Sequence, residues 1–86
     1  MNNVSSKISE FLLQNIIHDV EELDETQQLI DNGWVDSISI LKVILFMEKS
    51  FFISFDENDL LPEYFETLGT MTTLVHKKMS DNPVNA

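Results

Sequence analysis

The stretch that decides the fold is DSISILKVILFMEKSF, residues 36–51, within the longest run of helix-periodic apolar residues in the chain. Asp36 is a residue type that begins helices, because its carboxylate can accept a backbone N–H of the first turn. Val35 and Ile40 occupy the positions of a hydrophobic staple around this N-cap. We therefore predict a helix that begins at this cap and runs to about Phe51.

Ser37 follows the predicted cap directly. Its hydroxyl is therefore expected in solvent at the electropositive start of the helix, where another protein could modify it. Asn32 and Gly33, just upstream, supply the turn that leads into this junction. Taken alone, a serine in a first helical turn is most often an ordinary surface residue.

The apolar residues of the predicted helix fall on two separate arcs. The first, at roughly 240° to 340° from Ser37, is wide enough to be the core stripe; its members are Ile40, Val43, Ile44, Met47 and Phe51. The second, at roughly 40° to 100°, holds Ile38, Leu41 and Leu45. Either the helix is covered on most sides, or the second arc is an exposed patch beside Ser37. Because so small a domain can hardly cover one helix completely, we predict the exposed patch, which usually marks an interaction site.

The N-terminal part of the chain predicts a helix followed by an acidic loop. A helix from about Val4 to His18 follows from apolar residues spaced by three and four, namely Val4, Ile8, Phe11, Leu12 and Ile16. Residues 19–31 contain carboxylates and no basic residue, so we predict a long acidic loop there. Leu23, Leu29 and Ile30 are expected to anchor this loop to the core.

The C-terminal part predicts a short helix and a final long one. Residues 52–55 are apolar but have no strand to pair with, so we expect a loop that packs on the core. Asp56 is predicted to cap a short helix that stops before Pro62. A further turn is expected at residues 63–66, with Phe65 facing inward. The last helix runs from about Thr67 to Met79, with an inner stripe of Leu68, Met71, Leu74 and Val75.

Together these elements predict an all-α fold. We expect a small four-helix bundle with three main helices, one short helix and a long loop between helices one and two. Residues 1–79 are expected to form a single domain, because 86 residues leave no room for a second core. Residues 80–86 are predicted to be a disordered tail.

The charge of the chain limits its partners. Five lysines, no arginine and fifteen carboxylates give a formal net charge of −10. Because phosphate groups are bound by clustered basic residues, we expect no nucleic-acid partner. We also expect no membrane insertion, because the apolar runs are far shorter than the roughly 20 residues that a bilayer requires. A basic protein surface is the natural partner, unless the charge only keeps the domain soluble.

Several kinds of catalytic and metal site are excluded by the residues present. The chain has no cysteine, which rules out disulfides, a thiolate zinc site and a cysteine nucleophile, and fits a cytoplasmic location. The acidic cluster at residues 56–59 lacks the glycine and the terminal glutamate of a calcium loop, so we predict no metal site. No serine–histidine–acid set or phosphate loop can be identified, and we expect no enzymatic activity.

From about residue 4 to residue 79 the chain resembles a stand-alone acyl carrier protein, a family that includes the peptidyl and D-alanyl carriers. The matching residues are Leu29, Gly33, Val35-Asp36-Ser37-Ile38, Leu41, Ile44, Met47, Glu48, Phe51-Phe52, Ile53, Asp56, Asp59-Leu60, Pro62-Glu63, Phe65 and Leu74-Val75. Asp-Ser-aliphatic alone occurs by chance in many proteins. Its place after a glycine, at the start of the second helix of a small acidic helical chain, is more specific.

The resemblance implies that Ser37 is the attachment point of 4′-phosphopantetheine, transferred from coenzyme A by a magnesium-dependent phosphopantetheinyl transferase. Acyl or aminoacyl groups would be carried as thioesters on the thiol of this arm. An acyl- or aminoacyl-activating ligase or adenylation enzyme would load them, and a downstream synthase or transferase would receive them. Asp36 would cap the helix and be recognised by the transferase. The resemblance assigns partner docking to Ile38, Leu41, Leu45 and Glu48, and we expect a monomer.

The chain departs from the family pattern after the serine. Carriers of bacterial fatty-acid synthesis usually place acidic residues along this helix, whereas Ser39 and Lys42 stand here. This departure favours a carrier in a specialised pathway that makes a polyketide, a nonribosomal peptide or an unusual fatty acyl product. The alternative is a small acidic helical protein–protein interaction module without a prosthetic group, in which Ser37 only helps to cap the helix.

Overall fold

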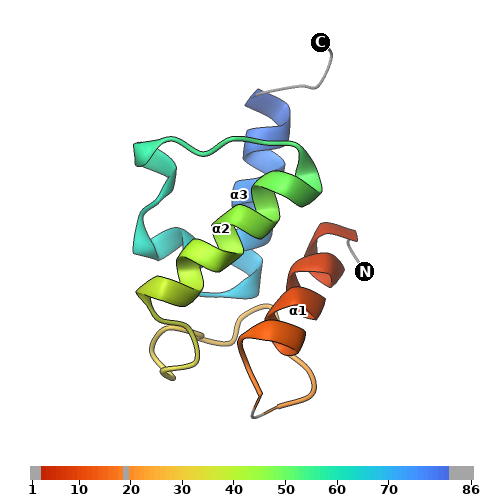
Figure 1. The fold of residues 1–86 in the computed structure, drawn as a ribbon, viewed down its shortest axis with the longest axis vertical. Coiled ribbons are helices and arrows are strands. Elements are labelled where there is room, and N and C mark those ends of the chain that lie inside the picture. Colours follow the sequence, from red (N-terminus) through yellow and green to blue (C-terminus); the bar gives the residue numbers. More distant parts are fainter. Residues whose placement is uncertain (1–2, 19, 82–86) are drawn as a thin grey trace.

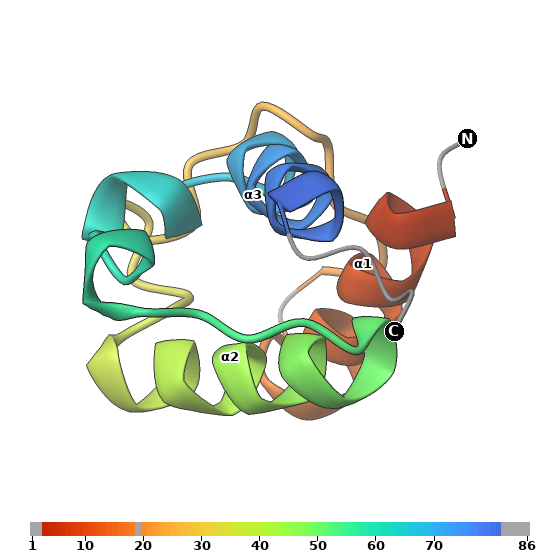
Figure 2. The same cartoon turned by 90° about the horizontal axis from the view of Figure 1, so that it is seen from above.

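The computed structural model describes residues 3–18 and 20–81 and contains three α-helices, α1 (Asn3–Asn15), α2 (Ser37–Phe51) and α3 (Leu68–Asp81). No strand occurs within these described ranges. Figure 1 shows α2 crossing in front of α3, with α1 beside them. Turned by 90°, the same fold has α2 below, α3 above and α1 at the right of a shared core (Figure 2). The predicted all-α class is confirmed.

The core lies where the inner faces of the three helices meet. Its fully buried side chains come from all three helices and from both connections between them, and include Ile8, Leu12, Ile17, Leu29, Met47, Phe65, Met71 and Leu74. The connections therefore form part of the core and fix how the helices lie against one another.

The first helix ends earlier than its sequence predicted. α1 stops at Asn15, not near His18. The backbone N–H groups of Ile16 and Ile17 both donate to the carbonyl of Leu12, at 2.9 and 2.7 Å. The hydrogen bond from Ile17, which spans five residues, closes a turn of a kind that is common at the ends of helices. It leaves Ile17 buried in the core, at 2% exposure.

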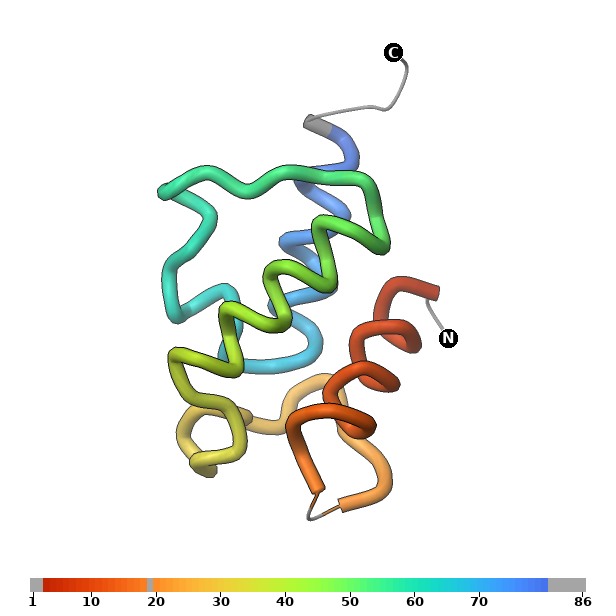
Figure 3. The backbone as a smooth tube through the Cα atoms, viewed as in Figure 1, coloured from red at the N-terminus to blue at the C-terminus, as the bar shows by residue number. Residues whose placement is uncertain are grey.

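Leu29 anchors the segment between α1 and α2, which Figure 3 traces below the helices. Its side chain is fully buried, and its N–H donates to the carbonyl of Glu66 at 2.8 Å. Leu23 and Ile30, also predicted as anchors, are half-buried and pack against the core. Gly33 follows with φ of 77°, a left-handed conformation that glycine adopts without strain. This turn delivers the chain to the start of α2.

The same segment is also tied to the first turn of α3. The N–H of Gly69 donates to the carbonyl of Glu25 at 2.9 Å. A Cβ atom at position 69 would lie 3.0 Å from that carbonyl oxygen, so glycine permits the close approach. The Glu25 carboxylate in turn accepts the hydroxyl of the buried Ser5, at 3.1 Å.

Residues 52–67, which connect α2 to α3, contain no fourth α-helix, and the turn expected at residues 63–66 begins at Pro62. Two 3₁₀ helices are present, η1 (Glu57–Asp59) and η2 (Pro62–Phe65). Asp56 caps η1 as predicted, because its Oδ1 accepts the N–H of Asn58 at 3.0 Å. Pro62 begins η2, a position where its missing N–H costs nothing. Proline therefore divides the segment into two short turns.

The third helix confirms its predicted inner face. Leu68, Met71, Leu74 and Val75 are all buried. Thr67 and Thr70 cap its start reciprocally, since each side-chain oxygen accepts the N–H of the other residue, at 3.1 and 3.0 Å. α3 continues to Asp81, so residues 80 and 81, predicted as tail, belong to the helix. The rest of the predicted tail, residues 82–86, lies outside the described residues.

Candidate functional site

Ser37 is the first residue of α2, and it is exposed. Asp36 precedes it with an extended backbone and caps the helix, because its Oδ1 accepts the N–H of Ser39 at 2.8 Å. The carbonyl of Asp36 accepts the N–H of Ile40 at 2.9 Å. The cap is made by the Asp36 side chain, so the start of the helix does not depend on the Ser37 hydroxyl.

The charge beside Ser37 is set by the same hydrogen bonds. The backbone N–H of Ser39, with a smaller contribution from its side chain, holds the pKa of the Asp36 carboxyl below its ordinary value. Asp36 is therefore ionised at neutral pH, where a carboxylate complements the positive end of the helix dipole. Ser37 therefore lies beside both the positive end of the helix dipole and the negative charge of Asp36.

One face of α2 exposes large apolar side chains next to Ser37. Ile38, Leu41 and Leu45, which we call the outer patch, are 67%, 60% and 62% exposed. On the opposite face, Val43 and Met47 are fully buried. The two arcs expected from the sequence are therefore an outer and an inner face of one helix. The predicted exposure of these three residues is confirmed, and their role in docking stays a prediction.

Phe46 belongs to neither arc and has a separate contact. Its ring stacks on that of Phe11 from α1, with ring centroids 4.3 Å apart, and meets Phe51 edge-on at 6.2 Å. Sequence periodicity missed this contact, although a phenylalanine outside both arcs was a signal that a third surface of α2 is covered. The outer patch is consequently bounded on one side by the α1–α2 contact.

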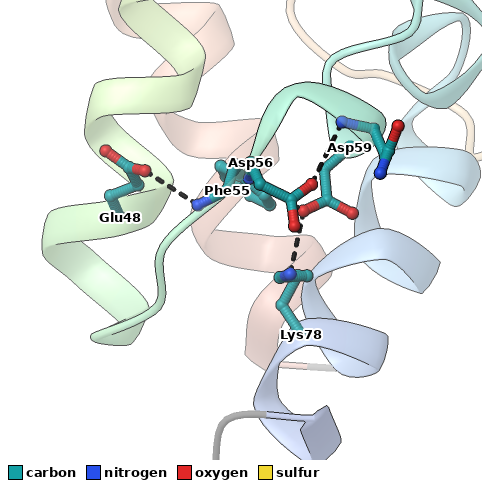
Figure 4. A network of polar contacts seen from close by, with 6 residues as sticks. Glu48, Phe55, Asp56, Asp59 and Lys78 are labelled. Carbon is teal, nitrogen blue, oxygen red and sulfur yellow. Dashed lines mark hydrogen bonds and ion pairs between the residues drawn. The ribbon is translucent and has the colours of Figure 1, made fainter.

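Glu48, predicted to contact partners, makes a contact within the chain. Its Oε2 accepts the backbone N–H of Phe55 at 2.9 Å, which ties α2 to the segment that follows it (Figure 4). The side chain is half-buried. Glu48 thus holds the connection between α2 and α3 against the last part of α2, a role that the sequence did not predict.

A buried ion pair lies in the same region, and the sequence analysis did not predict it. The Lys78 Nζ lies 2.8 Å from Asp59 Oδ2, with both side chains less than a tenth exposed. The same carboxylate oxygen accepts the N–H of Asp56 at 3.0 Å. Figure 4 shows Lys78 of α3 pointing up to the η1 turn, so that Asp59 joins the two elements.

A groove lies on another part of the molecule. It has a volume of about 790 Å³, runs between α1 and residues 23–25, and is lined by Ser5, Ser6, Ser9, Glu10, Leu13, Leu23, Asp24, Glu25 and Leu68. Neither Ser37 nor the outer patch contributes to it. Ser37 therefore lies on an open surface, where a group attached to it would extend into solvent or into a partner.

The described part of the chain contains no group of three or more His, Cys, Asp or Glu side chains placed to hold a metal ion. Among the described helices, none has the length and apolar character needed to cross a membrane. Comparison with family models and with curated proteins found no match to this chain.

Proposed function

We propose that this chain is a carrier protein that holds 4′-phosphopantetheine on Ser37 and presents acyl or aminoacyl thioesters to partner enzymes. The observation that carries the proposal is the exposed Ser37 hydroxyl at the start of α2, directly beside the exposed outer patch. A transferase needs access to the hydroxyl and a surface to which it can bind. Both lie on one accessible side of a single helix.

The residues around Ser37 are compatible with a phosphodiester at that oxygen. The start of a helix favours a negatively charged phosphate, because the backbone N–H groups and the helix dipole both point toward it. The Asp36 carboxylate opposes this effect, but it is already engaged with the N–H of Ser39. The arm would supply the thiol that the chain lacks. The chain's own residues would supply the attachment oxygen and the docking surface.

The alternative is an interaction module without a prosthetic group. The exposed outer patch favours it as much as it favours a carrier, because apolar surface of this kind attracts a partner in either case. The Ser37 hydroxyl separates the two functions. In the module it has no task, since the Asp36 side chain makes the helix cap.

The test is co-expression with a promiscuous phosphopantetheinyl transferase, followed by intact-mass measurement. We expect the mass to rise by one phosphopantetheinyl group. Ser37→Ala should abolish the rise while leaving the circular dichroism spectrum unchanged. Ser39→Ala is the matched control, because it removes a hydroxyl two residues away and keeps the N–H that Asp36 accepts. An unmodified wild-type chain would favour the interaction module.

A further inference from the structure

The charge of α2 is opposite in sign to that of the chain as a whole. α2 carries two lysines, Lys42 and Lys49, and one carboxylate, Glu48, although the chain has a formal net charge of −10. Both lysines are exposed. The described carboxylates gather mainly in residues 21–36 and 56–66, before and after this helix. The surface of α2 is therefore locally basic.

The two lysines flank the outer patch on one side. With Ser37 as the zero, the patch residues lie at roughly 40° to 100° around the helix, and Lys49 and Lys42 follow at roughly 120° and 140°. Glu48 lies on the other side, at roughly 20°. Its Oε2 is held by the N–H of Phe55, so this carboxylate is directed toward the chain itself. The edge of the patch farther from Ser37 thus offers positive charge to a partner.

We propose that the partner docking on α2 presents an apolar surface with carboxylates at its rim, placed opposite Lys42 and Lys49. This rests on the proposed function, because the partner is an enzyme that loads or unloads the carrier. Charges more than about 8 Å away are largely screened at physiological ionic strength. The charges that border the patch are therefore decisive. The two lysines lie at its edge farther from Ser37, while the ionised Asp36 precedes Ser37 at the start of the helix. The basic partner surface expected from the net charge therefore does not apply at the lysine edge. A second copy that docks through the same face of α2 fits poorly, because that face offers lysines and not carboxylates at its rim.

Two synthetic helical peptides serve as probes. They share one apolar face of leucine and phenylalanine, and they differ in a rim of glutamates or of lysines. Each is titrated into the isotope-labelled full chain, and binding is followed through the backbone amide signals. We expect the glutamate-rimmed peptide to shift the amide signals of residues 38–49. The lysine-rimmed peptide should instead shift the amide signals of the acidic loop at residues 21–25.

Two charge reversals test the role of the lysines. Lys42→Glu should weaken binding of the glutamate-rimmed peptide about fivefold, since an attraction is replaced by a repulsion at a solvent-exposed site. Lys77→Glu is the matched control, because it makes the same change of net charge at an exposed position on α3. It should leave that binding nearly unchanged. Thermal unfolding of both variants verifies that they remain folded.

Three results would overturn the inference: preference of α2 for the lysine-rimmed peptide, an equal loss in both variants, or no shift of α2 by the glutamate-rimmed peptide. Self-association through α2 at rising protein concentration would overturn it as well. These failures differ from failure of the proposed function. A chain that gains the phosphopantetheinyl mass but prefers the lysine-rimmed peptide contradicts only the inference about the partner. A chain that behaves as expected toward the peptides but gains no mass contradicts only the carrier function.

Discussion

Replacing Lys78 by methionine should destabilise the protein far more than replacing an exposed lysine. The Lys78 Nζ lies 2.8 Å from Asp59 Oδ2, and the two side chains are 9% and 6% exposed. Methionine retains most of the apolar stem, so the main effect is that the Asp59 carboxylate stays buried without its cation. Breaking a buried pair in this way costs about 3 kcal/mol. In a domain of this size that corresponds to a fall of about 12–24 °C in Tm.

Urea and thermal unfolding of Lys78→Met measure this loss, and Lys77→Met is the exposed control. The double variant Lys78→Met/Asp59→Asn should recover part of the stability. The second substitution removes the uncompensated charge. The amide oxygen of the new asparagine can still accept the N–H of Asp56, which the Asp59 carboxylate accepts at 3.0 Å in the wild type.

The pH dependence of this difference gives a second measurement. Burial alone would raise the pKa of Asp59, but the Lys78 ammonium and the N–H of Asp56 outweigh it and hold the pKa below its ordinary value. A carboxyl with a lowered pKa stabilises the fold above its unfolded-state pKa, and this contribution is lost as the pH falls through the folded-state value. Without the Lys78 ammonium, burial raises the pKa of Asp59, so protonation relieves the variant at a higher pH than that at which the wild type loses its contribution. The gap between wild type and Lys78→Met should therefore narrow progressively as the pH falls from neutral toward the folded-state pKa of the wild type. A loss below about 1 kcal/mol at neutral pH, or a gap that persists in acid, would refute this role of the pair.

Further substitutions test the two faces of α2 and its ends. Leu41→Asp should change the free energy of unfolding by less than about 0.5 kcal/mol, because the side chain is exposed, whereas Val43→Asp should prevent folding by burying an unpaired charge. Circular dichroism and urea unfolding of the two variants test this, and equal losses of stability would contradict the assignment of the two faces. Phe52→Gly should stabilise the protein by about 1 kcal/mol in urea unfolding. The exposed Phe52 has a left-handed backbone with φ of 55°, which glycine adopts more easily. If stability does not increase, the phenylalanine ring makes a compensating contact. Gly33→Ala should cost about 1 kcal/mol in the same assay, since φ is 77° and an added Cβ meets nothing within 4 Å; an unchanged stability would mean that the turn can relax.

The start and the two faces of α2 could be predicted because their causes are local. A carboxylate followed by a helix-periodic run specifies both the cap and the inner stripe, and Asp36 and Val43 occupy those positions in the structure. The exposure of Ser37 follows from its place directly after the cap. The exposure of Leu41 depends in addition on how few elements surround the helix, which the length of the chain indicated.

The features that sequence reasoning missed depend on contacts between distant residues. α1 ends at Asn15, and the chain then turns and buries Ile17. Asn15 was a weak stop signal, because the apolar Ile16 and Ile17 that follow it continue the helical pattern. The partner of Asp59 lies on α3, nineteen residues later, and a lysine in a polar helix looks like any surface lysine. The hydrogen bond from Phe55 to Glu48 could not be predicted, because it depends on how the segment after α2 folds back. The assignment of Glu48 to partner docking came from the family resemblance and stays a prediction.

The most direct measurement of the carrier function is the mass of the chain recovered from the cells that make it, followed by fragmentation to locate any added group. We expect phosphopantetheine, free or acylated, on the oxygen of Ser37. A chain that is entirely unmodified in those cells, or that carries its modification on another residue, would contradict it.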